Sequence, residues 1–177
     1  MAIIKGKVFV YGHDVNTDVI FPGKYTYTVT EPQEIASHSL EDEDPDFIKE
    51  VKPGDIIIAG KNFGCGSSRE HAAINPMFLG VKCVIAKSIA RIHKGNLVNH
   101  GIIPMLFEDP AAYDSIDQGD ELRIENLLDQ IPTRRVVVKD VTKHFEFTVK
   151  LDLTDNEIEV VLAGGQLRYL RRQLENM

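Results

Sequence analysis

A short run of glycines, serines and one arginine is the part of this sequence best suited to chemistry. Residues 64–66 read Gly-Cys-Gly, and Ser67, Ser68 and Arg69 follow directly. Glycine lets the backbone approach a ligand closely. Backbone N–H groups at the start of a helix attract anions, and the planar guanidinium of arginine suits bidentate carboxylate binding. The run therefore predicts an oxyanion or carboxylate site, with the alternative that the serines only cap the following helix and Arg69 is a surface residue.

The spacing of this run excludes three familiar kinds of site. A phosphate-binding loop would end in Gly-Lys-Ser/Thr, and a dinucleotide site would show Gly-x-Gly-x-x-Gly after the preceding strand. A hydrolase elbow would place glycines two residues away on both sides of its serine. His71 lies on the same helical turn as the serines, and a histidine there more often forms a structural hydrogen bond. The run is therefore not that of a nucleotide-binding loop or a serine hydrolase.

The elements that position this run alternate between strands and helices. Residues 56–59 are a short apolar strand, the glycine-rich turn follows, and residues 72–79 are typical of a helix. Further strands are expected over 81–86 and 102–107, with a helix over 89–99 between them. This order favours an α/β fold with a partly parallel sheet and crossover helices.

After residue 109 the sequence pattern changes. Segments in which apolar and polar residues alternate indicate half-exposed strands and an antiparallel region. Residues 11–28 are rich in turn-forming types and predict a long loop. The remaining predictions are strands over residues 3–10, 121–125, 135–140 and 145–151, a short helix opening over 31–38, and a helix over 155–174 interrupted by two glycines. Neither an internal repeat nor a low-complexity linker divides the chain, so we expect residues 1–177 to form a single domain.

Composition places the chain among ordinary folded proteins. Hydrophobic residues make up 43% and charged residues 27%, which excludes a disordered or collagen-like chain. A net charge of −7 provides no general attraction to nucleic acid or anionic lipid. Apolar stretches stay shorter than the ~18 residues that cross a bilayer, and the N-terminal residues do not read as a signal or transit peptide. We therefore expect a soluble cytoplasmic protein with neither a nucleic-acid nor a membrane partner.

The sequence contains two cysteines, Cys65 and Cys83. Two thiols cannot by themselves complete a four-thiolate zinc or iron–sulfur site. In a chain of this kind they are more often reduced than paired. We expect no metal site in this chain, so any cluster chemistry must come from elsewhere, and we expect Cys65 to pack beside the turn.

Two segments resemble the motifs of a known family. Residues 62–72 (NFGCGSSREHA) resemble the signature of the small subunit of 3-isopropylmalate dehydratase, in the aconitase superfamily. Residues 14–23 (DVNTDVIFPG) resemble its second hallmark, and residues 80–104 are similar to its central βαβ portion. The resemblance covers residues 3–107 well and the remainder loosely. It implies a swivelling β/β/α domain equivalent to the mobile fourth domain of aconitase.

The resemblance also implies a partner, a cofactor and a reaction. In the family a separate large subunit holds a 4Fe–4S cluster, and the small subunit closes over it in a heterodimer or heterotetramer. The implied reaction is a hydro-lyase isomerisation of a malate-type acid, by dehydration and rehydration at the neighbouring carbon. Iron acts as Lewis acid on the departing hydroxyl, while a serine alkoxide removes the proton from the adjacent carbon. Leucine biosynthesis is the pathway that the family implies.

Site residues follow from the resemblance position by position. Ser67 takes the place of the base, and its oxyanion would need the glycine-rich turn, the helix dipole and Arg69. Ser68 and Arg69 take the places of residues that bind a substrate carboxylate. Asp18 takes the place of an aspartate that orients nearby groups, with a simple turn aspartate as the alternative, and Thr17 is a weaker candidate. The remaining polar residues of these segments are expected to serve structure: Glu70, His71, His93 and His100.

Family members distinguish substrates through the loop after the Pro-Gly turn. The substrate-binding residues expected there are Lys24, Tyr25, Tyr27 and Thr28. Homoaconitase-like and aconitase-like proteins place an arginine near the Tyr27 position to bind a distal carboxylate. Because a desolvated carboxylate without a cation is costly, tyrosine there favours an alkyl substituent, as in 2-isopropylmalate or 2,3-dimethylmalate. Lys24 can still supply a charge, which leaves a homoaconitase small subunit as an alternative.

A function of another class is a non-catalytic anion-binding module that kept the turn and lost its partner. The discriminating observation is turnover, which the enzyme hypothesis requires only when a cluster-bearing large subunit is present. An RNA-binding role is disfavoured by the acidic balance of the chain.

Overall fold

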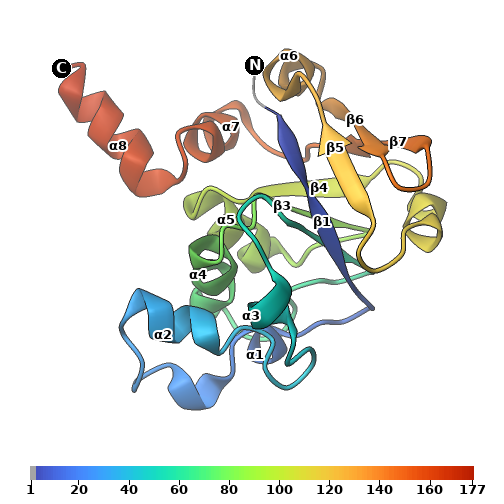
Figure 1. Ribbon diagram of the computed structural model, residues 1–177. Helices are drawn as coiled ribbons and strands as arrows, with labels where there is room; N and C mark the ends of the chain where they lie inside the picture. Colours follow the sequence, from blue (N-terminus) through green and yellow to red (C-terminus); the bar gives the residue numbers. More distant parts are fainter. Residues whose placement is uncertain (1–2) are drawn as a thin grey trace.

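The structure, a computed structural model, describes residues 3–177 and is built around a closed barrel (Figure 1). Within these residues the barrel order is β1-β2-β3-β4-β7-β6-β5. The strands are β1 (Ile4–Tyr11), β2 (Ile56–Ala59), β3 (Cys83–Ala86), β4 (Ile103–Phe107), β5 (Glu121–Ile124), β6 (Arg135–Asp140) and β7 (Phe145–Lys150). The predicted mixture of parallel and antiparallel strands in an α/β fold is confirmed.

The first four strands run parallel, as their alternation with helices predicts. Ile58 of β2 lies between Val10 of β1 and Ile85 of β3 in the register. β2 is buried along its whole length, in agreement with a strand covered on both faces. Ile56 and Ile58 pack with the strands of the barrel, while Ile57 joins the cluster that lies beneath the helices.

The antiparallel strands complete the barrel, and this closure is a feature that the sequence prediction missed. β7 pairs with β4, β6 with β7, and β5 with β6, all antiparallel. β5 then pairs antiparallel with β1, where Ile4 lies opposite Ile124. The predicted antiparallel region is therefore the other half of one barrel rather than an appendage to a parallel sheet.

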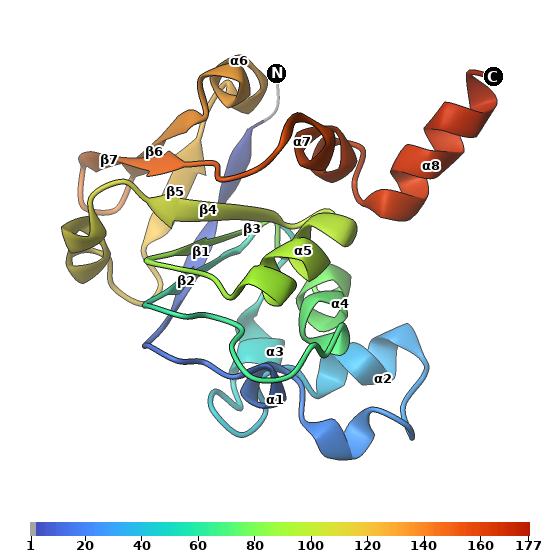
Figure 2. The same cartoon turned by 180° about the vertical axis from the view of Figure 1, so that it is seen from behind.

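Helices lie mainly around the outside of the parallel half of the barrel. Both views place α4 and α5 beside β1 to β4, and α8 extending away from the body (Figures 1 and 2). The helices are α1 (Thr17–Ile20), α2 (Pro32–Ser37), α3 (Phe47–Glu50), α4 (His71–Phe78), α5 (Arg91–Asn99), α6 (Leu127–Gln130), α7 (Asp155–Leu162) and α8 (Gln166–Glu175). Three 3₁₀ turns lie at Gly23–Tyr25, Pro110–Ser115 and Ile131–Thr133 among the described residues. Across residues 3–177, every helix is too short or too polar to cross a membrane.

Two local predictions around the glycine-rich run were wrong. The helix after it begins at His71, within one residue of the predicted range 72–79, and Glu70 takes the N-cap position without a side-chain hydrogen bond. Ser67 and Ser68 therefore do not cap the helix, which leaves their hydroxyls for other contacts. The predicted loop over residues 11–28 contains the short helix α1, capped by the Asn16 side chain, which accepts from the Asp18 N–H at 2.9 Å.

Candidate active site

The glycine-rich turn lies directly against a second loop and against helix α5, and glycine is required at both contacts. The backbone at Gly64 and Gly66 has φ values of +75° and +96°. A Cβ on Gly64 would lie 2.1 Å from the His93 ring, and one on Gly66 would lie 2.5 Å from the Asn16 side chain. Larger side chains at these two positions would therefore force the turn away from its neighbours.

Backbone hydrogen bonds join the two loops in register. Gly64 donates its N–H to the Val15 carbonyl at 2.8 Å, and Thr17 donates its N–H to the Cys65 carbonyl at 2.8 Å. The two segments that carry the family motifs, separated in the chain by helices α2 and α3 and strand β2, thus form one structural unit. This pairing places Thr17 beneath the turn that carries Ser67 and Ser68, which we call the serine turn.

Ser67 lies at the surface of this unit, and Thr17 lies beneath it. Ser67 is exposed, whereas Thr17 is only 1% exposed. The Thr17 hydroxyl donates to the Ser67 carbonyl at 3.0 Å, and the two hydroxyl oxygens are 3.2 Å apart. The serine hydroxyl is therefore open to a ligand on one side and in hydrogen-bond contact with a buried hydroxyl on the other.

Arg69 is held in place by groups from the neighbouring loop. Its Nη1 donates to Asp18 Oδ1 and, at 3.1 Å, to the Phe21 carbonyl. Asp18 Oδ1 also accepts from the Gly23 N–H at 2.7 Å. The hydrogen bond from Arg69, with that from Gly23, lowers the pKa of the Asp18 carboxyl below its ordinary value. Asp18 therefore stays ionised and orients the guanidinium beside the serine turn.

Backbone donors add to the positive potential of the turn. Within the described residues, the N–H groups of Ser67, Ser68 and Arg69 donate to no backbone carbonyl. They lie just before helix α4, where the helix dipole is positive. Free N–H groups, a guanidinium and a helix N-terminus together suit an anion or a developing oxyanion.

A shallow pocket of about 340 Å³ gathers part of the predicted site. Its walls contain Ser67, Ser68 and Arg69 from the turn and Tyr27 from the opposite loop. Gly23, Thr26, Glu70 and His71 complete the lining. The structure therefore brings together the serine turn and one of the four predicted loop residues.

The other three loop residues lie outside this pocket. Lys24 forms an ion pair with Glu41 at 3.0 Å, which raises the pKa of Lys24. Tyr25 stacks on the His38 ring with centroids 3.6 Å apart. The Thr28 hydroxyl donates to the Lys24 carbonyl at 3.5 Å. Tyr27, by contrast, is 95% exposed and faces the space beside Ser67.

Thr26 is a pocket residue that the sequence prediction did not select. Its hydroxyl is buried and has no hydrogen-bond partner within residues 3–177. Its position in the same Tyr/Thr run as Tyr27 was the available signal. Which residues of such a run face the pocket depends on the 3₁₀ turn Gly23–Tyr25, and that turn has no alternation that a pattern can detect.

The histidines are placed by packing and by one carboxylate. His71 stacks on Phe21 with ring centroids 5.0 Å apart. His93 is buried edge-on against Phe63, and both its ring nitrogens are without a partner in the described structure. Burial lowers the pKa of His93 to about 4. His100 Nε2 lies 2.9 Å from Glu70 Oε1.

The described residues do not offer a ligand set for an iron–sulfur cluster, which is held by cysteine thiolates. Cys83 is buried in β3, and burial raises the pKa of its thiol to about 12. Cys65 is partly exposed beside the turn. In residues 3–177, groups of three or more His, Cys, Asp or Glu that could hold a metal ion are absent.

Comparison with known proteins places this chain in an established family. The model of the aconitase C-terminal domain matches residues 15–110, which include both loops of the site. The 3-isopropylmalate dehydratase small subunit of Caldicellulosiruptor saccharolyticus is 41% identical over 98% of this chain and 94% of its own length. The methanogen homoaconitase small subunit of Methanocaldococcus jannaschii is 44% identical over 97% of this chain and 93% of its own.

A solved structure agrees with these relatives. The crystal structure of 3-isopropylmalate dehydratase (leuD) from Methanocaldococcus jannaschii superimposes with a TM-score of 0.84 and 40% identity, covering 97% of this chain and 95% of that one. The chain therefore belongs to the family of 3-isopropylmalate dehydratase small subunits, which carry the aconitase C-terminal domain.

Proposed function

We propose that this single-domain chain is the small subunit of a hydro-lyase that interconverts 2-isopropylmalate and 3-isopropylmalate and is active only with a large subunit. The observation that carries the proposal is the exposed Ser67 hydroxyl, set in a pocket beside Arg69 and in contact with the buried hydroxyl of Thr17. Relatives named as small subunits match nearly the whole chain, which supports a large subunit as the partner. A cluster, with its Lewis-acid chemistry, would be supplied by that partner.

Ser67 is the proton-transfer group of this proposal. In the dehydration step its alkoxide takes a proton from the carbon next to the one that bears the hydroxyl. The C–H electron pair becomes the C=C double bond as the hydroxyl leaves with the electron pair of its C–O bond, so that the proton on Ser67 and the departing hydroxide together amount to one water. Rehydration reverses these steps with the hydroxyl on the neighbouring carbon, and Ser67 returns the proton.

Thr17 suits the two charge states of Ser67. A threonine hydroxyl has one proton to donate and lone pairs to accept. With Ser67 neutral, Thr17 donates to the Ser67 carbonyl at 3.0 Å and can accept from the serine hydroxyl. With Ser67 ionised, the same proton turns to the alkoxide oxygen 3.2 Å away. A donor already in place stabilises the charged form and so favours its formation.

Arg69 has donors left for a substrate carboxylate. In the described residues only its Nη1 is engaged, by Asp18 and the Phe21 carbonyl. Nε and Nη2 therefore remain for bidentate binding, with the Ser68 hydroxyl on the same pocket wall. In this proposal Asp18 acts through Arg69, by fixing its orientation.

The pocket favours an alkyl substituent over a further carboxylate. Tyr27 offers an aromatic surface opposite the serine turn, while the nearest cation of that loop, Lys24, is paired with Glu41 outside the pocket. This placement supports 2-isopropylmalate, and 2,3-dimethylmalate fits the same description. A tricarboxylate is the second candidate, because a homoaconitase small subunit is 44% identical to this chain.

The deciding experiment mixes the purified chain with the large subunit of the 3-isopropylmalate dehydratase of the same organism after cluster reconstitution. Turnover of 2-isopropylmalate by the mixture, and by neither protein alone, is the expected result. Parallel assays with 2,3-dimethylmalate and a tricarboxylate rank the substrates. An inactive mixture together with anion binding by the chain alone would instead favour a non-catalytic binding module.

The family's swivelling motion belongs to the same proposal. The serine turn would face the large subunit, and closure of this domain over the partner would shield the pocket from water. Low-angle X-ray scattering of the complex with and without substrate tests this, because closure predicts a smaller radius of gyration with substrate bound.

A further inference from the structure

Helix α8 carries an apolar face that its own chain leaves uncovered. Every residue of α8 remains partly or fully exposed in the described structure. Leu167 and Leu174 are 84% and 72% exposed, and Leu170 lies between them on the same face at helical spacing. A contiguous exposed apolar stripe of this kind is typical of a surface that another element covers.

The direction of α8 is fixed by backbone packing at its base. A Cβ on Gly101, which follows α5, would lie 2.6 Å from the Gly164 carbonyl carbon in the turn between α7 and α8. On the first turns of α8, the Tyr169 hydroxyl donates to Glu159 Oε2 of α7 at 3.1 Å. The N-terminal end of α8 is therefore held against α5 and α7 by these contacts and is not joined to the barrel by a flexible linker.

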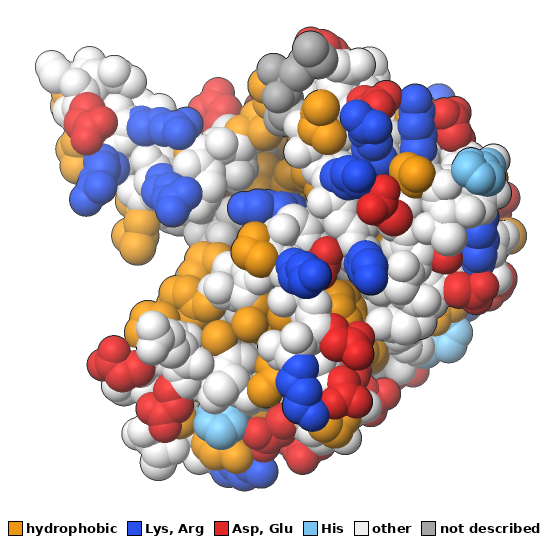
Figure 3. Space-filling model, in the orientation of Figure 1, with side chains coloured by type: hydrophobic (Ala, Val, Ile, Leu, Met, Phe, Trp, Pro, Cys, Tyr) orange, Lys and Arg blue, Asp and Glu red, His pale blue; other side chains and the backbone are white. Residues whose placement is uncertain are grey.

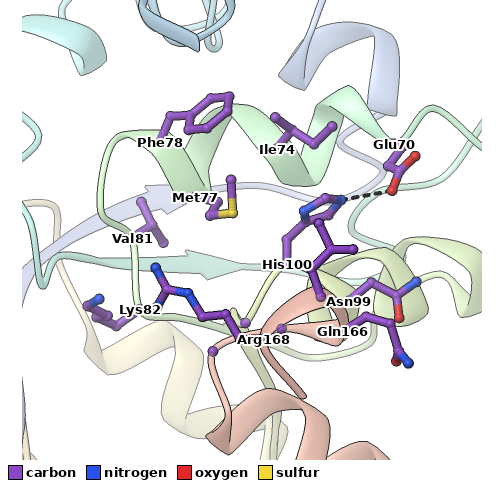
Figure 4. Close-up of a pocket in the computed structure, with 14 residues that line it drawn as sticks. Glu70, Ile74, Met77, Phe78, Val81, Lys82, Asn99, His100, Gln166 and Arg168 are labelled. Atoms are coloured by element: carbon purple, nitrogen blue, oxygen red, sulfur yellow. Dashed lines mark hydrogen bonds and ion pairs between the residues drawn. The ribbon is translucent and has the colours of Figure 1, made fainter. Parts of the chain in front are cut away.

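An apolar groove of about 760 Å³ runs between α8 and α4. Figure 4 shows Ile74, Met77 and Phe78 on α4 along one wall and Gln166 and Arg168, at the start of α8, on the other. Figure 3 shows hydrophobic side chains gathered along the notch beneath α8. The groove and the leucine face of α8 together form what we call the α4–α8 surface.

The α4–α8 surface is continuous with the candidate active site. Glu70 lines both the groove and the pocket of Ser67. His100, at the end of α5, lies 2.9 Å from Glu70 Oε1 on the groove side (Figure 4). A protein that covers the Ser67 pocket therefore meets the groove at the same rim.

Charge distinguishes this surface from the rest of the chain. The whole chain has a net charge of −7. Helix α8 instead carries Arg168, Arg171 and Arg172 against a single Glu175, and Lys82 lies in the groove wall. A second copy of the chain would bring its own arginines against these. An apolar segment with acidic flanks would complement them.

From these observations we infer that the large subunit seats an apolar, acid-flanked segment on the α4–α8 surface, in the groove beside Leu167 and along the adjoining leucine face of Leu170 and Leu174. The inference deepens the proposed function, because it takes the large subunit as the partner that covers Ser67. It assigns α8 as a docking element rather than a part of the fold.

The test compares binding of the purified large subunit by isothermal titration calorimetry, without substrate. A Leu167→Ser/Leu174→Ser double variant and a separate Phe78→Ser variant remove apolar surface from the two sides. Leu128→Ser on α6, where the side chain is 48% exposed, is the matched control. We expect affinity to fall at least about tenfold, or ~1.4 kcal/mol, for both groove variants and to stay unchanged for the control.

Three results would overturn the inference. Wild-type affinity of the double variant would remove α8 from the interface, and wild-type affinity of Phe78→Ser would remove the groove. If sedimentation shows a wild-type dimer that the double variant converts to a monomer with normal large-subunit affinity, the surface joins two copies of this chain. Because binding is measured without turnover, a complex that forms normally and does not turn over would defeat the proposed reaction and leave the docking surface intact.

Discussion

The hydroxyl oxygens of Thr17 and Ser67 lie 3.2 Å apart although fifty positions separate them in the sequence. Thr17 reaches this place because the loop that carries it pairs with the glycine-rich turn through backbone hydrogen bonds. One residue is buried and the other is open to the pocket. The pair therefore links the interior of the fold to the group that we propose transfers the proton.

Thr17→Val tests this link with little change in shape. Loss of the hydroxyl removes a donor to the Ser67 alkoxide, so we expect kcat of the reconstituted complex to fall about 10–100-fold with KM changed less than about threefold. The free energy of unfolding should fall by about 1 kcal/mol, since the Ser67 carbonyl loses its donor. Thr17→Ser, which keeps the hydroxyl, should retain most of kcat, and equal losses in both variants would remove the hydroxyl from the mechanism.

Ser67→Ala should abolish turnover while leaving substrate bound. Deleting a general base typically costs 10²–10⁴-fold in rate, so we expect kcat to fall by about a thousandfold and the Kd for 2-isopropylmalate to change less than about threefold. Ser68→Ala is the neighbouring control, expected to weaken binding more than it lowers kcat. Calorimetric binding and steady-state kinetics on the same complex separate the two effects, and unchanged kcat in Ser67→Ala would exclude Ser67 as the base.

Substitutions of neighbouring residues in the substrate loop should have very different effects on KM. Tyr27→Ala removes the only one of the four predicted loop residues that lines the pocket in the described structure, so we expect KM to rise about tenfold. Lys24→Ala and Thr28→Ala should change KM less than about twofold, because both side chains lie outside the pocket. A larger effect from Lys24→Ala would indicate that the lysine turns to a substrate carboxylate and would favour the tricarboxylate.

His93 should make stability depend on pH in the acidic range. Burial lowers its pKa in the folded state to about 4, while the unfolded chain titrates near the ordinary value of about 6.5. Between these values the unfolded state binds more protons, so His93 increasingly destabilises the fold as pH falls from about 6.5 toward 4. The free energy of unfolding of His93→Phe, measured by urea denaturation, should therefore exceed that of wild type by a margin that widens over this range.

The pH of the measurement provides its own control. At pH 8 the imidazole is neutral in both states, so the difference between His93→Phe and wild type should be constant there. A pH-independent difference across the whole range would mean that the His93 nitrogens find partners in solution that keep its pKa near the ordinary value.

Elements with a strong periodic or apolar signal were predictable from the sequence, and contacts between distant segments were not. The strand Ile56–Ala59 is found where four apolar residues are bounded by Pro-Gly and glycine. The barrel closes through the pairing of β1 with β5. The alternating pattern of each segment predicts that it is a strand but does not predict which strand it pairs with.

In the candidate site, too, the residues adjacent in the chain were predictable, and their contacts with distant residues were not. The motif predicts Ser67, Ser68 and Arg69 as neighbours because they are adjacent in the chain. That Arg69 is already held by Asp18, and that Lys24 faces Glu41 instead of the pocket, follow from a 3₁₀ turn and an ion pair with no sequence pattern of their own. The serines also looked like helix caps, because Ser is common at that position, yet the helix begins at His71.

Strand β1 pairs with β2 on one side and β5 on the other, and this limits how the protein can be joined to another. A sheet with free edges can extend into a neighbouring chain through backbone hydrogen bonds, which accept many sequences. Within the described residues the barrel has no such edge, so the sheet cannot recruit a strand from outside. Selectivity for a companion chain must then reside in loops and side chains, which can discriminate between related companions where a bare strand edge cannot.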